Sequence, residues 1–355
     1  PMFNAYIHGI GDYIPDLRID NSDFLERTFY SKTGLQESAD TRETIQRFSE
    51  VAGIHTRRLA DDGIMASHMG LKAAQEAIET SGIDPEQIDR IIFAHNTGDI
   101  TSHGSQSSFI PNLAAKVKRE LGIKNINCVA YDLIFGCCGW IEGVAQATVY
   151  IESGQASCVL VIGADTISRI TDHFDRDSMI FADGAGAVVM CATREDKGVK
   201  GFRTVSHCAE EADSLIMGPS NYPNCIPDQE YLKMNGLMVM RYALKEAPHL
   251  MSETLKMIGY KLEDIDYFLM HQANSKMVIM IIKRLFALEG IDSFPEEKVP
   301  LTAPYLGNNA VATAPTLLYE LAGLKLNDRG IRKGDLVAFA ALGSGMHASC
   351  LLHRF

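Results

Sequence analysis

The sequence predicts an α/β protein built from two similar halves, residues 1–195 and 196–355, in which helices cover parallel sheets. Apolar strand-like runs alternate with helical patterns along the chain, and this alternation is typical of such sheets. A length of 355 residues exceeds what one hydrophobic core usually supports. In addition, the sequence contains an internal repeat, with one copy of a similar segment in each half.

The repeat lies at the start of one strand in each half. Pro85-Glu-Gln-Ile-Asp-Arg-Ile-Ile-Phe-Ala94 matches Leu262-Glu-Asp-Ile-Asp-Tyr-Phe-Leu-Met-His271, including the Glu and the Ile-Asp pair. Each copy follows a long helix and precedes a polar loop, a helix and a strand–turn–helix unit. Two fused copies related by a pseudo-twofold axis bring equivalent strand ends together. We therefore expect Cys137, His271 and Asn308 to reach one pocket.

Hydrophobic periodicity predicts the elements of each half. The first half is expected to contain strand Ala5–Ile10, polar loop 28–46, helix Ser67–Thr80, strand Ile88–Ala94, helix Phe109–Leu121, and strands Cys128–Ala130, Cys158–Gly163 and Asp183–Met190. After a connection and surface loop at 192–230, the second half is expected to contain helix Met234–Met257, strand Ile265–Met270, helices Ser275–Leu288 and Asn309–Leu324, and strands Leu336–Leu342 and Ala348–Arg354.

Composition narrows the classes of function. The formal net charge of −12 argues against general nucleic-acid binding and against attraction to anionic membranes. No apolar run approaches the roughly 20 residues of a membrane helix. The eight cysteines form no Cys-x-x-Cys pair and show no zinc spacing, and the first residues lack the basic and apolar regions of a signal peptide. We expect a cytoplasmic chain with reduced thiols and no metal site.

The segment Gly136-Cys-Cys-Gly139 lies where a strand is expected to end and a helix to begin. Backbone N–H groups are unpaired at such a position and the helix dipole favours an anion. Both effects lower the pKa of a thiol and make it a nucleophile. The alternative is a small buried cysteine at the start of a helix, which is the commoner situation for an arbitrary cysteine.

Two downstream residues favour the nucleophile over that alternative. His271 directly follows the apolar strand Tyr267–Met270, and Asn308 lies at the repeat position equivalent to the cysteine turn. Taken alone, His271 fits a hydrogen-bonded structural histidine and Asn308 fits a turn or helix-capping residue. Their coincidence at equivalent points of the repeat indicates a shared site.

The segment Gly343-Ser-Gly-Met-His-Ala348 formally fits the dinucleotide fingerprint G-x-G-x-x-A. That fingerprint opens a helix and is followed about 20 residues later by an acidic ribose ligand. Only seven residues follow Ala348, so a nucleotide site is excluded. We interpret the loop as a source of backbone donors for an oxyanion.

With these motifs, the chain resembles the thiolase-like superfamily, and within it β-ketoacyl-ACP synthase III and its specialised relatives. The agreement runs from about Ile10 to Phe355, and its anchors are Asp132, Cys137, Gly139, Asp183-Gly-Ala-Gly-Ala187, Tyr231-Leu-Lys-Met-Asn-Gly236, His271-Gln-Ala-Asn274, Gly307-Asn308 and Gly343-Ser-Gly345. The resemblance implies a thiolase-like fold, with two duplicated α/β halves packed in αβαβα layers.

The resemblance also implies a reaction and the residues that perform it. Cys137 takes an acyl group from a thioester, and His271 and Asn308 then promote decarboxylation of a malonyl thioester and hold its enolate. The backbone N–H groups of Cys137 and Gly345 are expected to hold the acyl oxyanion. The product is a β-ketoacyl chain for fatty-acid or specialised lipid or polyketide biosynthesis. No cofactor is expected beyond thioester substrates on coenzyme A or acyl carrier protein.

Partner contacts are implied in the same way. Lys276, Lys283 and Arg284 share one face of a helix, where they are expected to dock an acidic carrier protein. The alternative for these residues is an ordinary solvated helix face. Arg169 matches a position that contacts the coenzyme A nucleotide, and Ile110 matches a residue that walls the acyl tunnel of the partner in a homodimer.

Several features depart from the family pattern. The family carries an adenine-stacking tryptophan near Arg47, whereas the single tryptophan here is Trp140, and segment 28–46 is longer than usual. These departures suggest a specialised relative loaded from a carrier protein, comparable to dialkylresorcinol or aryl-polyene ketosynthases. The alternatives are an acyltransferase of the same fold that uses an alcohol or amine acceptor, a 3-hydroxy-3-methylglutaryl-CoA synthase type, and a partner subunit of a heterodimeric ketosynthase.

Overall fold

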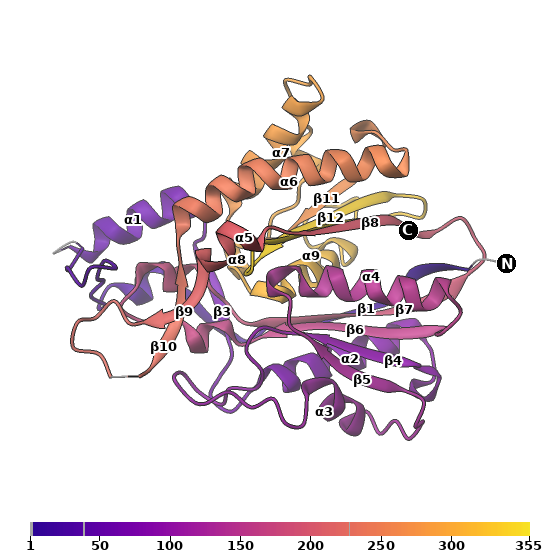
Figure 1. Cartoon of the computed structure of the whole chain (residues 1–355), viewed down its shortest axis with the longest axis horizontal. Coiled ribbons are helices and arrows are strands. Elements are labelled where there is room, and N and C mark those ends of the chain that lie inside the picture. The colour runs from indigo at the N-terminus through magenta and orange to yellow at the C-terminus, as the bar shows by residue number, and fades with distance from the viewer. Residues whose placement is uncertain (1–2, 38–39, 227) are drawn as a thin grey trace.

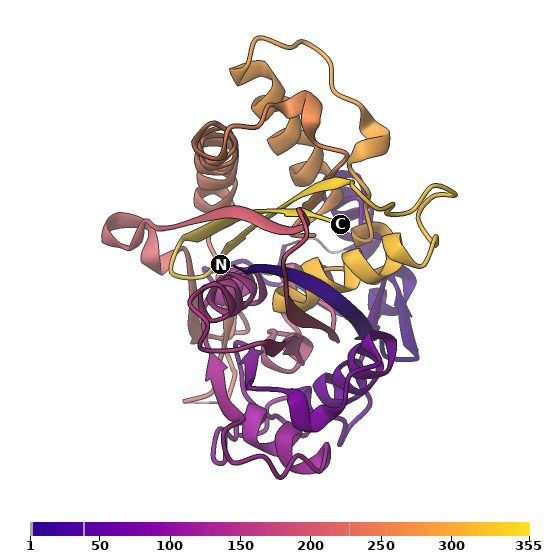
Figure 2. The same cartoon turned by 90° about the vertical axis from the view of Figure 1, so that its right-hand side faces the viewer.

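The structure, a computed structural model, describes residues 3–37, 40–226 and 228–355 (Figure 1). Residues 1 and 2, residues 38 and 39 of the predicted loop 28–46, and residue 227 of the predicted loop 192–230 lie outside the described residues. Two sheets lie one above the other, with helices between them and on both outer faces (Figure 2). This is the layered α/β arrangement that the sequence predicts.

The first sheet has the strand order β1-β7-β6-β4-β5. Its strands are β1 (Asn4–Tyr13), β4 (Arg90–Ala94), β5 (Val129–Leu133), β6 (Cys158–Asp165) and β7 (Gly184–Thr193). Strand β4 runs parallel to β5 and β6, whereas β7 pairs antiparallel with both β6 and β1. The sheet is therefore mixed, not wholly parallel as expected.

The second sheet has the strand order β11-β12-β13-β8. Its strands are β8 (Gly198–Ser206), β11 (Tyr267–Met270), β12 (Leu336–Gly343) and β13 (His347–Arg354). Here β11 and β12 are parallel, and β13 is antiparallel to β12 and to β8. Four strands of the first sheet, β1-β7-β6-β4, therefore have counterparts in the order β8-β13-β12-β11. The predicted boundary at residue 195 falls between β7 and β8.

The repeated sequence has the same backbone contacts in both halves. The Asp89 N–H donates to the Cys158 carbonyl at 2.9 Å, and the Asp266 N–H donates to the Leu336 carbonyl at 2.8 Å. In each half the aspartate carboxylate accepts a hydrogen bond from the backbone N–H of the same partner residue. The Ile-Asp pair therefore fixes equivalent strands in register, which explains why it is present twice.

The helices form three layers around the sheets. Helices α2 (Ala66–Ser81) and α3 (Leu113–Glu120) cover the outer face of the first sheet, and α6 (Gly236–Ile258) and α7 (Ser275–Leu288) cover that of the second. Helices α4 (Gly139–Glu152) and α9 (Thr313–Ala322) lie between the sheets (Figure 2). Their side chains share one apolar core with both sheets, so the two halves are packed as a single body.

The remaining elements surround the open end of this sandwich. They are β2 (Leu17–Asp20), α1 (Thr41–Ala52), β3 (Thr56–Leu59), α5 (Cys208–Glu211), β9 (Leu215–Pro219), β10 (Glu230–Met234) and α8 (Ala303–Leu306). Short 3-10 helices lie in connections throughout the described chain, at Asn21–Phe24, Pro85–Gln87, Gly136–Cys138, Ile167–Ile170, Arg176–Ile180, Ala212–Ser214, Leu262–Asp264, Glu296–Lys298 and Ala310–Ala312.

Several predicted segments differ from the structure. Helix α1 occupies part of the predicted loop 28–46, because Asp40 caps its first turn and Gly53, at φ +65°, ends it. The predicted helix Phe109–Leu121 begins only at Leu113, after a cis Ile110–Pro111 bond. The predicted loop 192–230 contains strands β8 and β9.

Two further findings concern the whole described chain. Among residues 3–37, 40–226 and 228–355, no helix is both long and apolar enough to cross a membrane. All eight cysteines are free thiols.

Candidate active site

A cavity of about 690 Å³ lies at the open end of the sandwich, between helix α1 and strands β9 and β10 on one side and the ends of both sheets on the other. A volume of this size is typical of small-molecule sites. Its lining includes Cys137, His271 and Asn308, which come from three separate parts of the chain. The structure thus brings together the three residues that the repeat placed at one pocket. We call these three residues, together with Gly343, the floor of the cavity.

Cys137 lies in the 3-10 turn Gly136–Cys138, between strand β5 and helix α4. Gly136 adopts φ +59°, a conformation that favours glycine, and a Cβ there would lie 2.6 Å from the Ser344 nitrogen. Burial raises the pKa of the Cys137 thiol to about 12, with the Asp165 carboxylate contributing. The predicted lowering of this pKa by the helix start is therefore wrong, because loss of hydration outweighs it.

His271 continues strand β11, and its N–H donates to the Ala340 carbonyl at 2.7 Å. Its Nδ1 lies 2.6 Å from the Thr313 hydroxyl at the start of α9. Burial lowers the pKa of the imidazole to about 4, so His271 is neutral near pH 7. A hydroxyl partner can either donate to Nδ1 or accept from it. Thr313 therefore holds the ring in place without fixing which nitrogen carries the proton.

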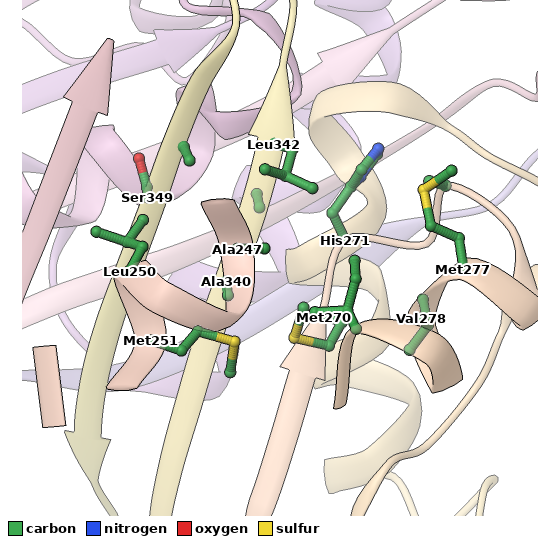
Figure 3. Close-up of a pocket in the computed structure, with 14 residues that line it drawn as sticks. Ala247, Leu250, Met251, Met270, His271, Met277, Val278, Ala340, Leu342 and Ser349 are labelled. Atoms are coloured by element: carbon green, nitrogen blue, oxygen red, sulfur yellow. The ribbon is translucent and has the colours of Figure 1, made fainter. Parts of the chain in front are cut away.

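The apolar side chains behind His271 explain why its imidazole is neutral. A second pocket of only about 10 Å³, room for at most one water molecule, lies there and is lined mostly by apolar side chains. Figure 3 shows His271 between Leu342 and Met277, with Leu250 and Met251 further along this wall. An imidazolium ion facing such a surface would lose hydration with no compensating partner.

Asn308 is held mainly by its backbone. Its N–H donates to the Ile180 carbonyl at 3.0 Å, and its carbonyl accepts from the Ala182 N–H at 2.8 Å. The side-chain oxygen accepts from the Ala310 N–H at 2.9 Å. Among the described residues the Asn308 Nδ2 group has no hydrogen-bond acceptor, so it is available to donate to a ligand in the cavity.

The glycine loop packs against the cysteine turn. A Cβ on Gly343 would lie 2.5 Å from the Cys137 nitrogen, which places the Gly343–Ser344 peptide against the cysteine turn. The Gly345 carbonyl accepts a hydrogen bond from the Cys208 thiol at 3.2 Å, and Gly345 lies against the His347 ring. The contribution of the Gly345 N–H to an oxyanion hole stays a prediction.

Arg169 does not reach the cavity. It is 3% exposed, and its guanidinium donates to backbone carbonyls, among them that of Asp61 at 2.7 Å. The structure therefore contradicts its predicted contact with a coenzyme A nucleotide. Arg176, seven residues later, lines the opening of the cavity instead, and its side chain is 55% exposed.

The other predicted residues lie at the surface. Lys276, Lys283 and Arg284 are exposed on α7, whose first turn also supplies Met277 to the cavity. Ile110 is 91% exposed and does not line the cavity of its own chain. Within the motif His271-Gln-Ala-Asn274, the sequence predicts no role for Gln272; its buried amide oxygen accepts from the Thr302 N–H at 2.9 Å and anchors the His271 loop.

A fold of two fused α/β halves with a cysteine, a histidine and an asparagine around one cavity defines a class of acyl-transferring, thioester-condensing enzymes. Comparison with known proteins gives the family. The model for the N-terminal part of 3-oxoacyl-[acyl-carrier-protein] synthase III matches residues 131–208, and that for its C-terminal part matches residues 255–355. The β-ketoacyl-[acyl-carrier-protein] synthase III of Brucella suis is 32% identical over 360 residues, covering 100% of both chains.

Solved structures agree with that match. The 3-oxoacyl-[acyl-carrier-protein] synthase III of Aquifex aeolicus has a TM-score of 0.80 and 26% identity, covering 99% of this chain and 100% of its own. A priming β-ketosynthase from a polyketide biosynthetic pathway has a TM-score of 0.81 and 25% identity, covering 99% of this chain and 97% of its own. The chain belongs to the β-ketoacyl-ACP synthase III family of the thiolase-like fold, and it is an acyltransferase of the condensing type.

Proposed function

We propose that Cys137, His271 and Asn308 carry out a decarboxylative Claisen condensation, in fatty-acid or specialised lipid or polyketide biosynthesis. One observation carries this proposal: the three side chains come from both halves of the chain and line the same cavity. The reaction divides into acylation of Cys137 and condensation with a malonyl-type thioester, so a difficult carbon–carbon bond is made in two easier steps.

In the first step the Cys137 sulfur attacks the carbonyl of an acyl thioester, and the carbon–sulfur bond of the donor breaks. Because burial keeps the thiol protonated, its proton must leave as the new bond forms. The neutral imidazole of His271 is the base in this cavity. It takes the proton and passes it to the departing thiolate. The backbone N–H groups of Cys137 and Gly345 hold the oxyanion.

In the second step a malonyl thioester loses carbon dioxide, and the electron pair of the broken bond forms an enolate. His271, with its Nε2 protonated, and the Asn308 Nδ2 group donate to the enolate oxygen. The enolate carbon then attacks the acyl carbonyl, the bond from that carbonyl to the Cys137 sulfur breaks, and the released thiolate takes up one proton from the solvent. Both donors bind the negatively charged enolate oxygen more strongly than the neutral carbonyl of the substrate. They therefore lower the activation barrier and do not only strengthen substrate binding. No resident cofactor takes part in either step.

Release of carbon dioxide from a malonyl carrier protein tests this assignment. In the Asn308→Ala variant the release should fall by roughly 10²–10³, because one enolate donor is lost. The acyl adduct on Cys137 should still form in the same variant, which provides an internal control for folding. Unchanged release would contradict condensation. An adduct that forms in the native protein without any release would favour transfer to an alcohol or amine.

The surface supports partners of two kinds. Exposed Lys276, Lys283 and Arg284 form a basic face on α7 beside the cavity, which suits an acidic carrier protein despite the net charge of −12. Apolar side chains also follow the open edge of β5: Ile126, Val129 and Ile134 are 90%, 46% and 61% exposed. We propose that a second copy covers this edge in a cytoplasmic homodimer, with Ile110 reaching the cavity of the partner.

A further inference from the structure

We infer that the charged opening of the cavity selects an acyl donor carried on a carrier protein and discriminates against acyl-coenzyme A. The five charged side chains at the opening are called the rim: Glu37, Glu43, Arg47, Arg176 and Asp177. The inference rests on the proposed function, because it names the donor for the acylation of Cys137. It assigns to the rim carboxylates a role in specificity and not in the chemical step.

The rim is separate from the floor in both origin and exposure. Its residues come from the segment before α1, from α1 itself and from the 3-10 helix Arg176–Ile180. Glu43 and Arg47 are exposed and Asp177 is half-buried, whereas His271 and Asn308 at the floor are buried. Any acyl thioester that reaches Cys137 must place the far end of its carrier arm at or beyond the rim.

Carboxylates outnumber guanidinium groups at the rim. Arg176 Nη1 lies 3.2 Å from the Glu37 carboxylate, so its charge is already balanced within the protein. Arg47 has no ion-pair partner among the described residues, and Glu43 lies one helical turn before it on the same cavity-facing side of α1. Arg47 is therefore the one rim cation left to meet a ligand within the described chain, with Glu43 and Asp177 close by.

The two possible donors differ most in charge at this point. Coenzyme A ends its pantetheine arm with a nucleotide that carries a diphosphate and a 3′-phosphate. The same arm on a carrier protein ends in a single phosphodiester, which one arginine can match. The remaining negative charges of a carrier protein lie on its folded surface, where the basic face of α7 can meet them. A nucleotide would instead bring several phosphate charges against the rim carboxylates, which is unfavourable.

The test compares acylation of Cys137 by the same acyl group on coenzyme A and on an acyl carrier protein. The measured quantity is the ratio of kcat/KM for the two donors, obtained by intact mass at early times with acetyl and hexanoyl groups. The native protein should favour the carrier protein. In the double variant Glu37→Gln, Glu43→Gln the ratio should shift toward coenzyme A by about tenfold, because the Glu43 charge is lost and Arg176 is released from its ion pair with Glu37.

Two further variants complete the experiment. Glu50→Gln removes the same charge from α1, but Glu50 does not line the cavity, so the ratio should stay within twofold of the native value. Arg176→Gln removes a rim cation, so it should shift the ratio further toward the carrier protein. A native preference for coenzyme A, or a ratio that is the same in the double variant, would overturn the inference while leaving the proposed function standing. Acylation by neither donor would contradict both.

Discussion

The floor and the rim of the cavity are built in opposite ways. Floor residues follow strand ends or tight turns, and backbone hydrogen bonds fix them, such as that from the His271 N–H to the Ala340 carbonyl at 2.7 Å. Rim residues are side chains on α1 and on connecting segments, and a single ion pair, Glu37 with Arg176, links them. The floor is therefore neutral and fixed by the backbone, whereas the rim is charged and on the whole more exposed.

This difference assigns the two parts different tasks. A preorganised, poorly hydrated floor suits a reaction whose charge appears only in the transition state. A solvated rim affects which acyl donor enters the cavity, through electrostatic interactions that salt screens. Changes at the floor should therefore alter the chemical step strongly, and changes at the rim or the outer surface should alter donor choice by small factors.

The largest expected effect concerns pH and the Cys137 thiol. Because burial raises its pKa to about 12, the thiolate fraction near pH 7 is very small and grows as pH rises. Alkylation of Cys137 by iodoacetamide should accelerate about tenfold for each pH unit between roughly pH 7 and 10. Peptide mass mapping follows the modification, with N-acetylcysteine as the reference thiol. A plateau below pH 8 would show instead that the turn stabilises the thiolate.

The next effect tests the contact between the cysteine turn and the glycine loop. Gly136→Ala places a Cβ 2.6 Å from the Ser344 nitrogen, and the resulting displacement should lower kcat/KM by about 10². Gly122→Ala is the matched control, since Gly122 also has a positive φ, +72°, but nothing lies within 4 Å of the added Cβ. Gly122→Ala should lose about 1 kcal/mol of unfolding free energy. Gly136→Ala should lose more, because its Cβ also collides with backbone atoms. Equal activity in the two variants would rule out the proposed contact.

A smaller effect is expected from the partner of His271. Thr313→Val keeps the shape of the side chain but removes the hydroxyl that lies 2.6 Å from Nδ1. Condensation should slow by about tenfold, because the ring loses its orientation. Thr316→Val, on the same helix, removes a buried hydroxyl that bonds to the Ala312 carbonyl and not to His271, so it is the control. Equal rates in the two variants would mean that Thr313 only stabilises the fold.

The smallest effect lies outside the cavity. Alanine at Lys276, Lys283 or Arg284 should raise KM for a carrier-protein substrate by only a few-fold each, with a weaker dependence on salt. Lys333→Ala, also exposed but away from the cavity lining, should leave KM unchanged. A fall in kcat without a change in KM would place these residues in a different role.

The sequence predicts the floor better than the rim for a physical reason. The repeat defines where strands β4 and β11 end, and a strand end fixes the residue that follows it, as at His271. Cys137 and Asn308 follow from the same symmetry. These positions depend on regular backbone pairing, which leaves a periodic pattern in the sequence.

The sequence does not predict the position of residues that are held by irregular, long-range contacts. Arg169 and Arg176 lie seven residues apart in one connection, and only the long-range contact of Arg169 with the Asp61 carbonyl shows which of them is enclosed. In the same way, the close approach of Gly343 to the Cys137 nitrogen depends on the turn between β12 and β13. Helix α1 was hidden because its apolar face is short and charged residues interrupt it.

Intact-mass measurement of the acylated protein tests the central claim most directly. After incubation with an acyl carrier donor, the native protein should gain one acyl group, and Cys137→Ala should gain none. Cys138→Ala is the closest control, because this neighbouring thiol is buried and lies 3.3 Å from the His347 carbonyl. It should acylate like the native protein. An adduct that persists in Cys137→Ala and disappears in Cys138→Ala would contradict the account.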